Sequence, residues 1–163
     1  MSEVQTDQTR ALRDALGMFA TGVAVVTTRS PQGAPIGLTI NSFNSVSLDP
    51  PLIVWSLARE QADLSIYEAC EYYAVNILAA DQVELSQRFA SRLEDRFAGV
   101  EHDLGIGGIP LLRDGCARFE CRNTLRHDGG DHLMFVSEVV AFECTPRLPL
   151  VFFGGMYRAL EEI

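Results

Sequence analysis

The feature of this sequence that most constrains its fold is a strict alternation of apolar and polar residues near the C-terminus. Residues 117–126 (ARFECRNTLR) place Ala117, Phe119, Cys121, Asn123 and Leu125 on one face of an extended strand. The turn-forming sequence Asp128-Gly129-Gly130-Asp131 follows, and a second extended stretch covers residues 132–143. This pattern predicts a long antiparallel β-hairpin with one inward face, which includes Leu125, and one solvated face.

The rest of the chain adds more strands than helices. Helical periodicity covers residues 7–20, 62–70 and 82–90, and extended segments cover residues 22–29, 35–48, 52–57, 72–78 and 150–153. Residues 91–113 contain several glycines and a proline, so we expect a loop there. Strands joined mostly by turns favour a mainly β fold, an antiparallel barrel with peripheral α-helices, over a doubly wound parallel sheet. With 163 residues and no internal repeat or linker, the chain is predicted to form one domain over residues 1–163.

Charge and hydropathy argue against several classes of partner. The net charge of −9 disfavours nucleic acid, whose phosphates it would repel. No apolar run approaches the roughly 18–20 residues that a membrane span needs, so no membrane partner is expected. The polar N-terminus shows no secretion signal, and the four cysteines show no Cys-x-x-Cys spacing, which predicts a cytoplasmic protein with free thiols. His127 and His132 flank a turn without a matching third ligand, so no metal site is predicted.

Residues 37–51 (GLTINSFNSVSLDPP) are the strongest indication of a binding site. Seven of these fifteen residues are Thr, Asn, Ser or Asp, and apolar residues separate them. In an extended segment Thr39 and Asn41 share one face, and burying such a polar row without partners is costly. Either a ligand with many donors and acceptors covers the row, or the side chains make local turn bonds at a strand end. No Gly-x-Gly-x-x-Gly or Walker motif is present, so any nucleotide is bound by other means.

Several motifs in a fixed order give the chain a family resemblance. They are FATGVAVVTT at residues 19–28, the segment 37–51, NIL at 76–78 with LSQRFA at 85–90, FEC at 119–121 with GDH at 130–132, and GMY at 155–157. Each motif is weak alone, but the ordered set over residues 10–158 resembles the short-chain flavin reductases, the reductase components of two-component flavin-dependent monooxygenases. This resemblance implies an FMN-binding split barrel that uses NADH or NADPH to reduce FMN or FAD. It also implies a homodimer that supplies reduced flavin to a monooxygenase, with flavin sites that can lie at the subunit boundary.

The resemblance also implies roles for particular residues. Thr39, Asn41 and Ser42 would contact the isoalloxazine edge and the ribityl-phosphate part, and Ser45 of the same segment is assigned to cofactor binding with them. Ser56 and Ala58 would line the same cleft. The helix would close around the ribityl and phosphate groups through Ser86, Phe89 and Ala90, and a phosphate cation would come from Arg88 or Arg96.

His132 and Tyr157 would border the nicotinamide. A neutral His132 imidazole would hydrogen-bond the carboxamide or a cofactor phosphate, and it is the predicted catalytic residue. The alternative is a histidine at a strand start whose bonds are made by Asp131 or the turn. Two departures from the family pattern stand out: Ser137, which is expected to add bulk near the nicotinamide approach, and residues 59–63 (REQAD), which lack the usual Ser or Thr.

Two rival functions remain at this stage. A flavin-binding protein of the same fold without reductase turnover would share every flavin contact but would not depend on His132. An oxidase of a small phosphorylated amine would need more basic residues around the phosphate than this acidic chain offers. Hydride transfer between a nicotinamide and a flavin needs no protein acid, base or nucleophile, which agrees with the absence of a recognisable triad or carboxylate pair.

Overall fold

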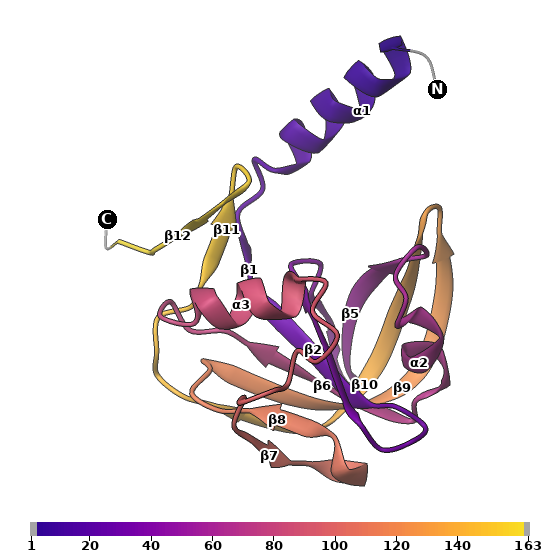
Figure 1. Cartoon of the computed structure of the whole chain (residues 1–163), viewed down its shortest axis with the longest axis vertical. Helices are drawn as coiled ribbons and strands as arrows, with labels where there is room; N and C mark the ends of the chain where they lie inside the picture. The colour runs from indigo at the N-terminus through magenta and orange to yellow at the C-terminus, as the bar shows by residue number, and fades with distance from the viewer. Residues whose placement is uncertain (1–2, 162–163) are drawn as a thin grey trace.

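A computed structural model describes residues 3–161 of the chain. Its main body is a seven-stranded sheet in which every neighbouring pair is antiparallel (Figure 1). In spatial order the strands are β3 (Pro35–Ile40), β2 (Ala24–Arg29), β6 (Tyr72–Ile77), β9 (Ala117–Gly129), β10 (His132–Cys144), β5 (Pro51–Ala58) and β4 (Asn44–Leu48). Residues from six of these strands pack into one apolar cluster. Within it Trp55 of β5 contacts Tyr73 of β6, although β9 and β10 lie between these strands in the sheet, so the sheet curls into a barrel.

The centre of this barrel is aromatic. Trp55 on β5 stacks on Phe135 of β10, with ring centroids 4.5 Å apart. Tyr73 of β6 and Tyr67 meet the indole edge to face at 5.5 and 5.4 Å. All four side chains have no exposed surface. Aromatic pairs of this kind add to the free energy of area burial, so they anchor β5, β6 and β10 to one another.

Smaller elements decorate the barrel. The strands β1 (Thr21–Gly22), β11 (Val151–Phe153) and β12 (Met156–Arg158) form a second sheet, and β7 (His102–Leu104) pairs with β8 (Pro110–Leu112) beside a 3₁₀ turn at Ile106–Gly108. Helix α2 (Leu64–Ala69) and helix α3 (Val83–Ala90) lie against the barrel, whereas α1 (Glu3–Leu16) projects away from it (Figure 1). The mainly β architecture with peripheral helices is therefore confirmed.

The predicted hairpin is present as β9 and β10, but its inward face is interrupted. The strand register shifts between Asn123 and Leu125. These two residues are separated by one residue on β9, whereas their partners on β10, Ser137 and Val136, are adjacent. Leu125 is consequently 53% exposed, and its predicted inward orientation is wrong. On β10, Ser137 is fully buried inside the barrel. The expectation that Ser137 lies at the nicotinamide approach is therefore also wrong.

Two other segments differ from their expected structure. The N-terminal helix occurs at Glu3–Leu16, earlier than the predicted 7–20. Residues 91–113, expected to be a loop, contain the paired strands β7 and β8, since the apolar run Ile109–Leu112 packs against the barrel. All four cysteines are free thiols, as predicted. No helix within residues 3–161 is long and apolar enough to cross a membrane, and no group of three metal-ligating side chains occurs there.

Candidate functional site

The site is built where helix α3 lies on strand β3. This close approach requires a glycine at position 37. A Cβ on Gly37 would lie 2.7 Å from the ring of Phe89, on α3, and 3.2 Å from that of Phe97. Phe89 is itself 1% exposed and meets Phe97 edge to face, so its ring has no room to retreat. Without a side chain at position 37, the helix lies low enough for its polar face to reach β3.

Two hydrogen bonds join the helix to its neighbours. The Thr39 hydroxyl on β3 donates to the backbone carbonyl of Ser86 over 2.7 Å. The Ser86 hydroxyl is 2.8 Å from the phenol oxygen of Tyr157, which comes from β12 near the C-terminus. The Tyr157 ring rests edge to face on Phe152, with centroids 5.6 Å apart. Ser86 is thus the point at which three distant segments of the chain meet.

A pocket of about 200 Å³ opens beside this junction. It is lined by Val23, Thr39, Ile40, Asn41, Ser86, Ala90, Phe152 and Tyr157. A larger cavity of about 620 Å³ adjoins it and shares Asn41 and Phe152, continuing along the end of α1 toward Met18 and Phe19. Both spaces combine an apolar lining with a few polar groups, which is the usual character of a cofactor site.

A second group of predicted site residues lies on the outer face of β5 and β10. The Ser42 hydroxyl donates to the carbonyl of Ser56 at 3.0 Å and accepts the N–H of Ser56 at 3.1 Å. This ties the end of the 37–51 segment to β5. Where β5 pairs with β10, Ala58 lies opposite His132. This second surface therefore begins at Ser42, the residue after Asn41 of the pocket, and continues through Ser56, Ala58 and His132.

Besides Ser42, Ser56 and Ala58, five predicted residues do not line the pocket. Phe89 lies in the core and positions α3, and Ser45 is exposed on the edge strand β4. Arg88 donates to the carbonyls of Arg96 and Ala98. Arg96 donates to the carbonyls of Ser91 and Gly37 and pairs with Asp63 at 3.1 Å. These two guanidinium groups fasten residues 91–98 to α3 and to the barrel, and these contacts occupy half of their N–H donors.

The fifth is His132, the predicted catalytic residue. Its Nδ1 atom is 2.7 Å from a carboxylate oxygen of Asp131, and its side chain is 43% exposed. The Asp131 contact that was raised as an alternative is therefore present, although it occupies only one of the two ring nitrogens. Within one protomer, His132 lines none of the pockets that contain Asn41 or Tyr157.

Sequence reasoning missed the apolar residues of the pocket. Val23 and Ile40 are buried, and Phe152 forms part of both cavities. Their only sequence signal is membership of short apolar strands, which most core residues share. Arg59 was also missed as a structural residue: its guanidinium group pairs with Asp128, across the hairpin turn.

Comparison with known proteins bears directly on this arrangement. The family model described as flavin reductase like domain matches residues 16–161. The chain belongs to this flavin reductase-like family. It is 42% identical to the FMN reductase (NADH) SmoA of Agrobacterium fabrum, over 93% of this chain and 86% of the relative. It is 43% identical to the stachydrine N-demethylase reductase subunit Stc3 of Rhizobium meliloti, over 92% of this chain but 65% of that longer protein.

The fold of this flavin reductase-like chain also matches solved structures. The NADH:FAD oxidoreductase SgcE6 of Streptomyces globisporus, solved in complex with NAD and FAD fragments, superposes with a TM-score of 0.90 at 35% identity. The match covers 95% of this chain and 94% of that one. The resemblance deduced from the ordered motifs is therefore confirmed at the level of the family and of the fold.

The pocket residues fit a flavin. Hydroxyl groups of Thr39, Ser86 and Tyr157 and the amide of Asn41 offer donors and acceptors suited to a ribityl chain or ring edge. Val23, Ile40 and Phe152 offer an apolar surface suited to an aromatic ring system. The buried Thr21 hydroxyl oxygen, which has no hydrogen-bond partner among residues 3–161, lines the adjoining cavity. The lining of the 200 Å³ pocket contains no carboxylate that would repel a cofactor phosphate, whereas the adjoining cavity is lined by both Arg13 and Asp14.

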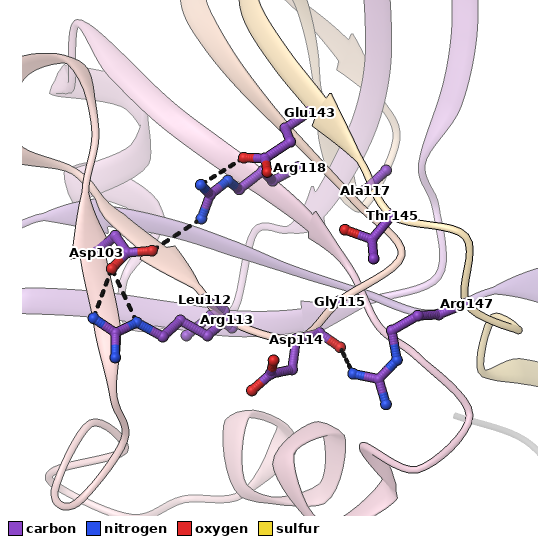
Figure 2. A pocket seen from close by; sticks show the side chains of 10 residues that line it. All are labelled: Asp103, Leu112, Arg113, Asp114, Gly115, Ala117, Arg118, Glu143, Thr145 and Arg147. Atoms are coloured by element: carbon purple, nitrogen blue, oxygen red, sulfur yellow. Dashed lines mark hydrogen bonds and ion pairs between the residues drawn. The ribbon is translucent and has the colours of Figure 1, made fainter.

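A different pocket, of about 280 Å³, is drawn in Figure 2 and does not suit a flavin. Its arginines are already paired: Arg118 bridges Asp103 and Glu143, and Arg113 also binds Asp103. Arg147 donates to the Asp114 carbonyl at 2.6 Å. An anion would have to displace these carboxylates, so the pocket is a surface network of ion pairs.

Proposed function

We propose that this chain is an NAD(P)H-dependent flavin reductase that transfers hydride from a nicotinamide cofactor to FMN or FAD. The proposal extends to delivery of the reduced flavin to a partner monooxygenase. The single observation that carries it is the pocket between α3, β3 and β12, where Thr39, Ser86 and Tyr157 gather polar groups beside an apolar wall. The names of the relatives, an FMN reductase (NADH), an N-demethylase reductase subunit and the reductase component of a flavin-dependent monooxygenase, support the same activity.

The cofactors supply the redox chemistry when bound, so the protein's task is to bind and orient them. In this proposal Thr39, Asn41 and Tyr157 hold the flavin in the pocket, and Ser42 and Ser56 continue its polar border. Ala58, a small residue beside His132, leaves space for a nicotinamide on the outer face of β5 and β10. His132 orients that ring through a hydrogen bond.

The test is an anaerobic reaction of the purified chain with flavin and either NADH or NADPH. Bleaching of the flavin's visible absorption well above the protein-free rate is expected, and the ratio of the two rates identifies the preferred nicotinamide. Thr39→Val, which loses the pocket hydroxyl at nearly constant volume, should weaken flavin binding. Thr145→Val, at an exposed site in the charged pocket of Figure 2, is the matched control. A wild-type rate equal to the protein-free rate would refute the proposal.

A flavin-binding protein without turnover is the second candidate, because the pocket alone accounts for binding. The position of His132 outside the pocket separates the two functions. His132→Ala should reduce the NADH-dependent rate much more than it reduces flavin affinity if the chain is a reductase. Flavin binding by both proteins, with neither rate above the protein-free rate, would favour the second candidate.

The proposal includes a homodimer, for which α1 gives the main support. All side chains of residues 7–16 are exposed, and the apolar Leu12 and Leu16 are 61% and 67% exposed. A helix of this length is marginal in water unless its apolar side packs against something. The neighbouring Met18 and Phe19 are also exposed and border the 620 Å³ cavity. A second copy of the chain is the occupant that we propose for this surface.

Sedimentation equilibrium tests the dimer. The wild-type chain should sediment at twice its 18.0 kDa mass, and Leu12→Glu with Leu16→Glu should sediment as a monomer. Leu104→Glu, an equally exposed apolar residue on β7, is the control and should remain dimeric. A wild-type monomer at micromolar concentration would contradict this part of the proposal.

A further inference from the structure

The turn of the β9–β10 hairpin is held by a residue from outside the hairpin. Arg59, the first residue after β5, donates its backbone N–H to the carbonyl of Asp131 at 2.9 Å. Its side-chain Nε donates to the carbonyl of Gly130 at 3.2 Å, and its guanidinium group pairs with Asp128. The arginine therefore contacts both sides of the turn, although hairpin tips are normally among the most mobile parts of a fold.

Gly130 gives the turn its shape. It has φ = +73°, in the left-handed region that residues with a Cβ rarely adopt. This conformation reverses the chain direction just before Asp131 and His132, the first residue of β10. Arg59 binds the carbonyls of the two peptide groups on either side of Asp131, whose carboxylate lies beside the imidazole.

The contact between Asp131 and His132 has a definite chemical consequence. A carboxylate only accepts hydrogen bonds, so the Nδ1 atom 2.7 Å away must carry the proton. The hydrogen bond and the charge of the ring hold the pKa of the Asp131 carboxyl below its ordinary value, so the acceptor is ionised at neutral pH. In the neutral imidazole the other nitrogen, Nε2, then has a lone pair and no proton.

We propose that Asp131 and Arg59 are positioning residues, which present the Nε2 lone pair of His132 as an acceptor for the carboxamide N–H of a dihydronicotinamide. This inference rests on the proposed reductase function and deepens it. It also selects the nicotinamide carboxamide over a cofactor phosphate as the partner of His132. A ring nitrogen without a proton can accept a hydrogen bond from an amide but cannot donate one to a phosphate. The inference also gives a structural role to Arg59, in the stretch where the usual Ser or Thr is missing.

The first test measures the tautomer directly. The chain has three histidines, so ¹⁵N-labelled imidazoles can be assigned with a His132→Gln variant. In the neutral ring of His132 we expect the proton on Nδ1. Asp131→Ala should shift the ring toward the Nε2–H form, and Asp131→Asn, whose amide oxygen still accepts, should retain much of the original tautomer. A neutral Nε2–H ring in the wild-type protein would overturn the inference.

The second test uses a substrate without the amide donor. Reduced 3-acetylpyridine adenine dinucleotide replaces the carboxamide by an acetyl group, so its kcat/KM relative to that of NADH reports the hydrogen bond. Loss of one hydrogen bond corresponds to roughly a 2- to 12-fold change. The NADH preference of the wild type should fall by about this factor in His132→Ala and Asp131→Ala, and by much less in Asp131→Asn. An unchanged preference in His132→Ala would overturn the inference while leaving the reductase proposal intact.

Arg59 is tested against a matched arginine. Arg59→Gln should raise the KM for NADH several-fold with little change in kcat or in flavin affinity, and Arg59→Lys should raise it less. Arg126→Gln is the control, because Arg126 is exposed on β9 and makes no ion pair in the described part of the chain. If Arg59→Gln weakens flavin binding as much as NADH binding, Arg59 contacts the flavin and is not a positioning residue. Absence of any NADH oxidation by the wild type would instead refute the proposed function itself.

Discussion

Replacing Gly37 by alanine should damage both the stability and the flavin site. The new Cβ would lie 2.7 and 2.8 Å from two ring carbons of Phe89, well inside contact distance. The Phe89 ring is buried and packed against Phe97, so relief requires α3 to move outward. Overpacking of this kind costs about 1–3 kcal/mol in the free energy of unfolding.

The predicted cost has two measurable effects. For a domain of this size the melting temperature should fall by roughly 2–12 °C, at about 2–4 °C per kcal/mol. Outward movement of α3 should also lengthen the 2.7 Å hydrogen bond from Thr39 to Ser86 and weaken flavin binding. Thermal unfolding followed by circular dichroism measures the first effect, and flavin fluorescence titration measures the second.

Gly22 provides the control. It also lies in a strand, but a Cβ there would meet no atom within 4 Å, so Gly22→Ala should change neither quantity appreciably. A second variant, Gly37→Ala with Phe89→Leu, should recover part of the loss, because the smaller side chain makes room for the new methyl group. Equal melting temperatures and flavin affinities for Gly37→Ala and Gly22→Ala would refute the packing argument.

Three further predictions follow from individual contacts. Tyr157→Phe removes the phenol oxygen bound to Ser86 and should weaken flavin binding roughly 2- to 12-fold, whereas the same change in a Ser86→Ala background should have little effect. Hydrogen bonds from two arginines hold the pKa of Asp103 below its ordinary value, so its stabilising effect is present at neutral pH and is lost as the pH falls through that lowered value. Urea unfolding should therefore show that the free energy of unfolding falls less between pH 7 and pH 3 for Asp103→Asn than for the wild type. Burial raises the pKa of the Cys121 thiol to about 12, so a thiol reagent at pH 8 should modify exposed Cys144 quickly and Cys121 only after unfolding.

Each of these predictions has a result that contradicts it. A full effect of Tyr157→Phe in the Ser86→Ala background would mean that the phenol acts without Ser86. An equal decrease in the free energy of unfolding for Asp103→Asn and the wild type would show that this carboxylate does not contribute to the loss of stability in acid. Rapid modification of Cys121 in the native protein would show that the barrel interior opens readily.

The β9–β10 hairpin shows how well the alternation of residues in the sequence predicts strand structure. The alternation over residues 117–126 and the turn at Gly129-Gly130 predicted β9 and β10 closely, since side-chain direction in a strand follows sequence position. The pattern failed at Leu125, because a bulge inserts a residue on β9 and reverses the alternation beyond it. A bulge depends on how two strands pair, and a single strand's sequence carries little trace of it.

The candidate site divides in the same way. Thr39, Asn41, Ser86 and Tyr157 were named from their motifs, and the structure brings them together in one pocket. Arg88 and Arg96 were named for their charge, yet their donors bind backbone carbonyls of residues 91–98. Charge can be read from a sequence, but the partner that satisfies it depends on which loop lies within reach.

The sequence by itself therefore determined the strands of the main sheet, the hairpin and the membership of a flavin reductase-like family, because each depends on local periodicity or on motif order. Only the tertiary structure decided that Ser86 binds Thr39, 47 residues away, and Tyr157, 71 residues away. It also decided that Ser137 lies inside the barrel and that Arg59 holds the turn before His132. These contacts arise from strand pairing and from the depth at which α3 packs over Gly37, and such distances are fixed by the whole fold.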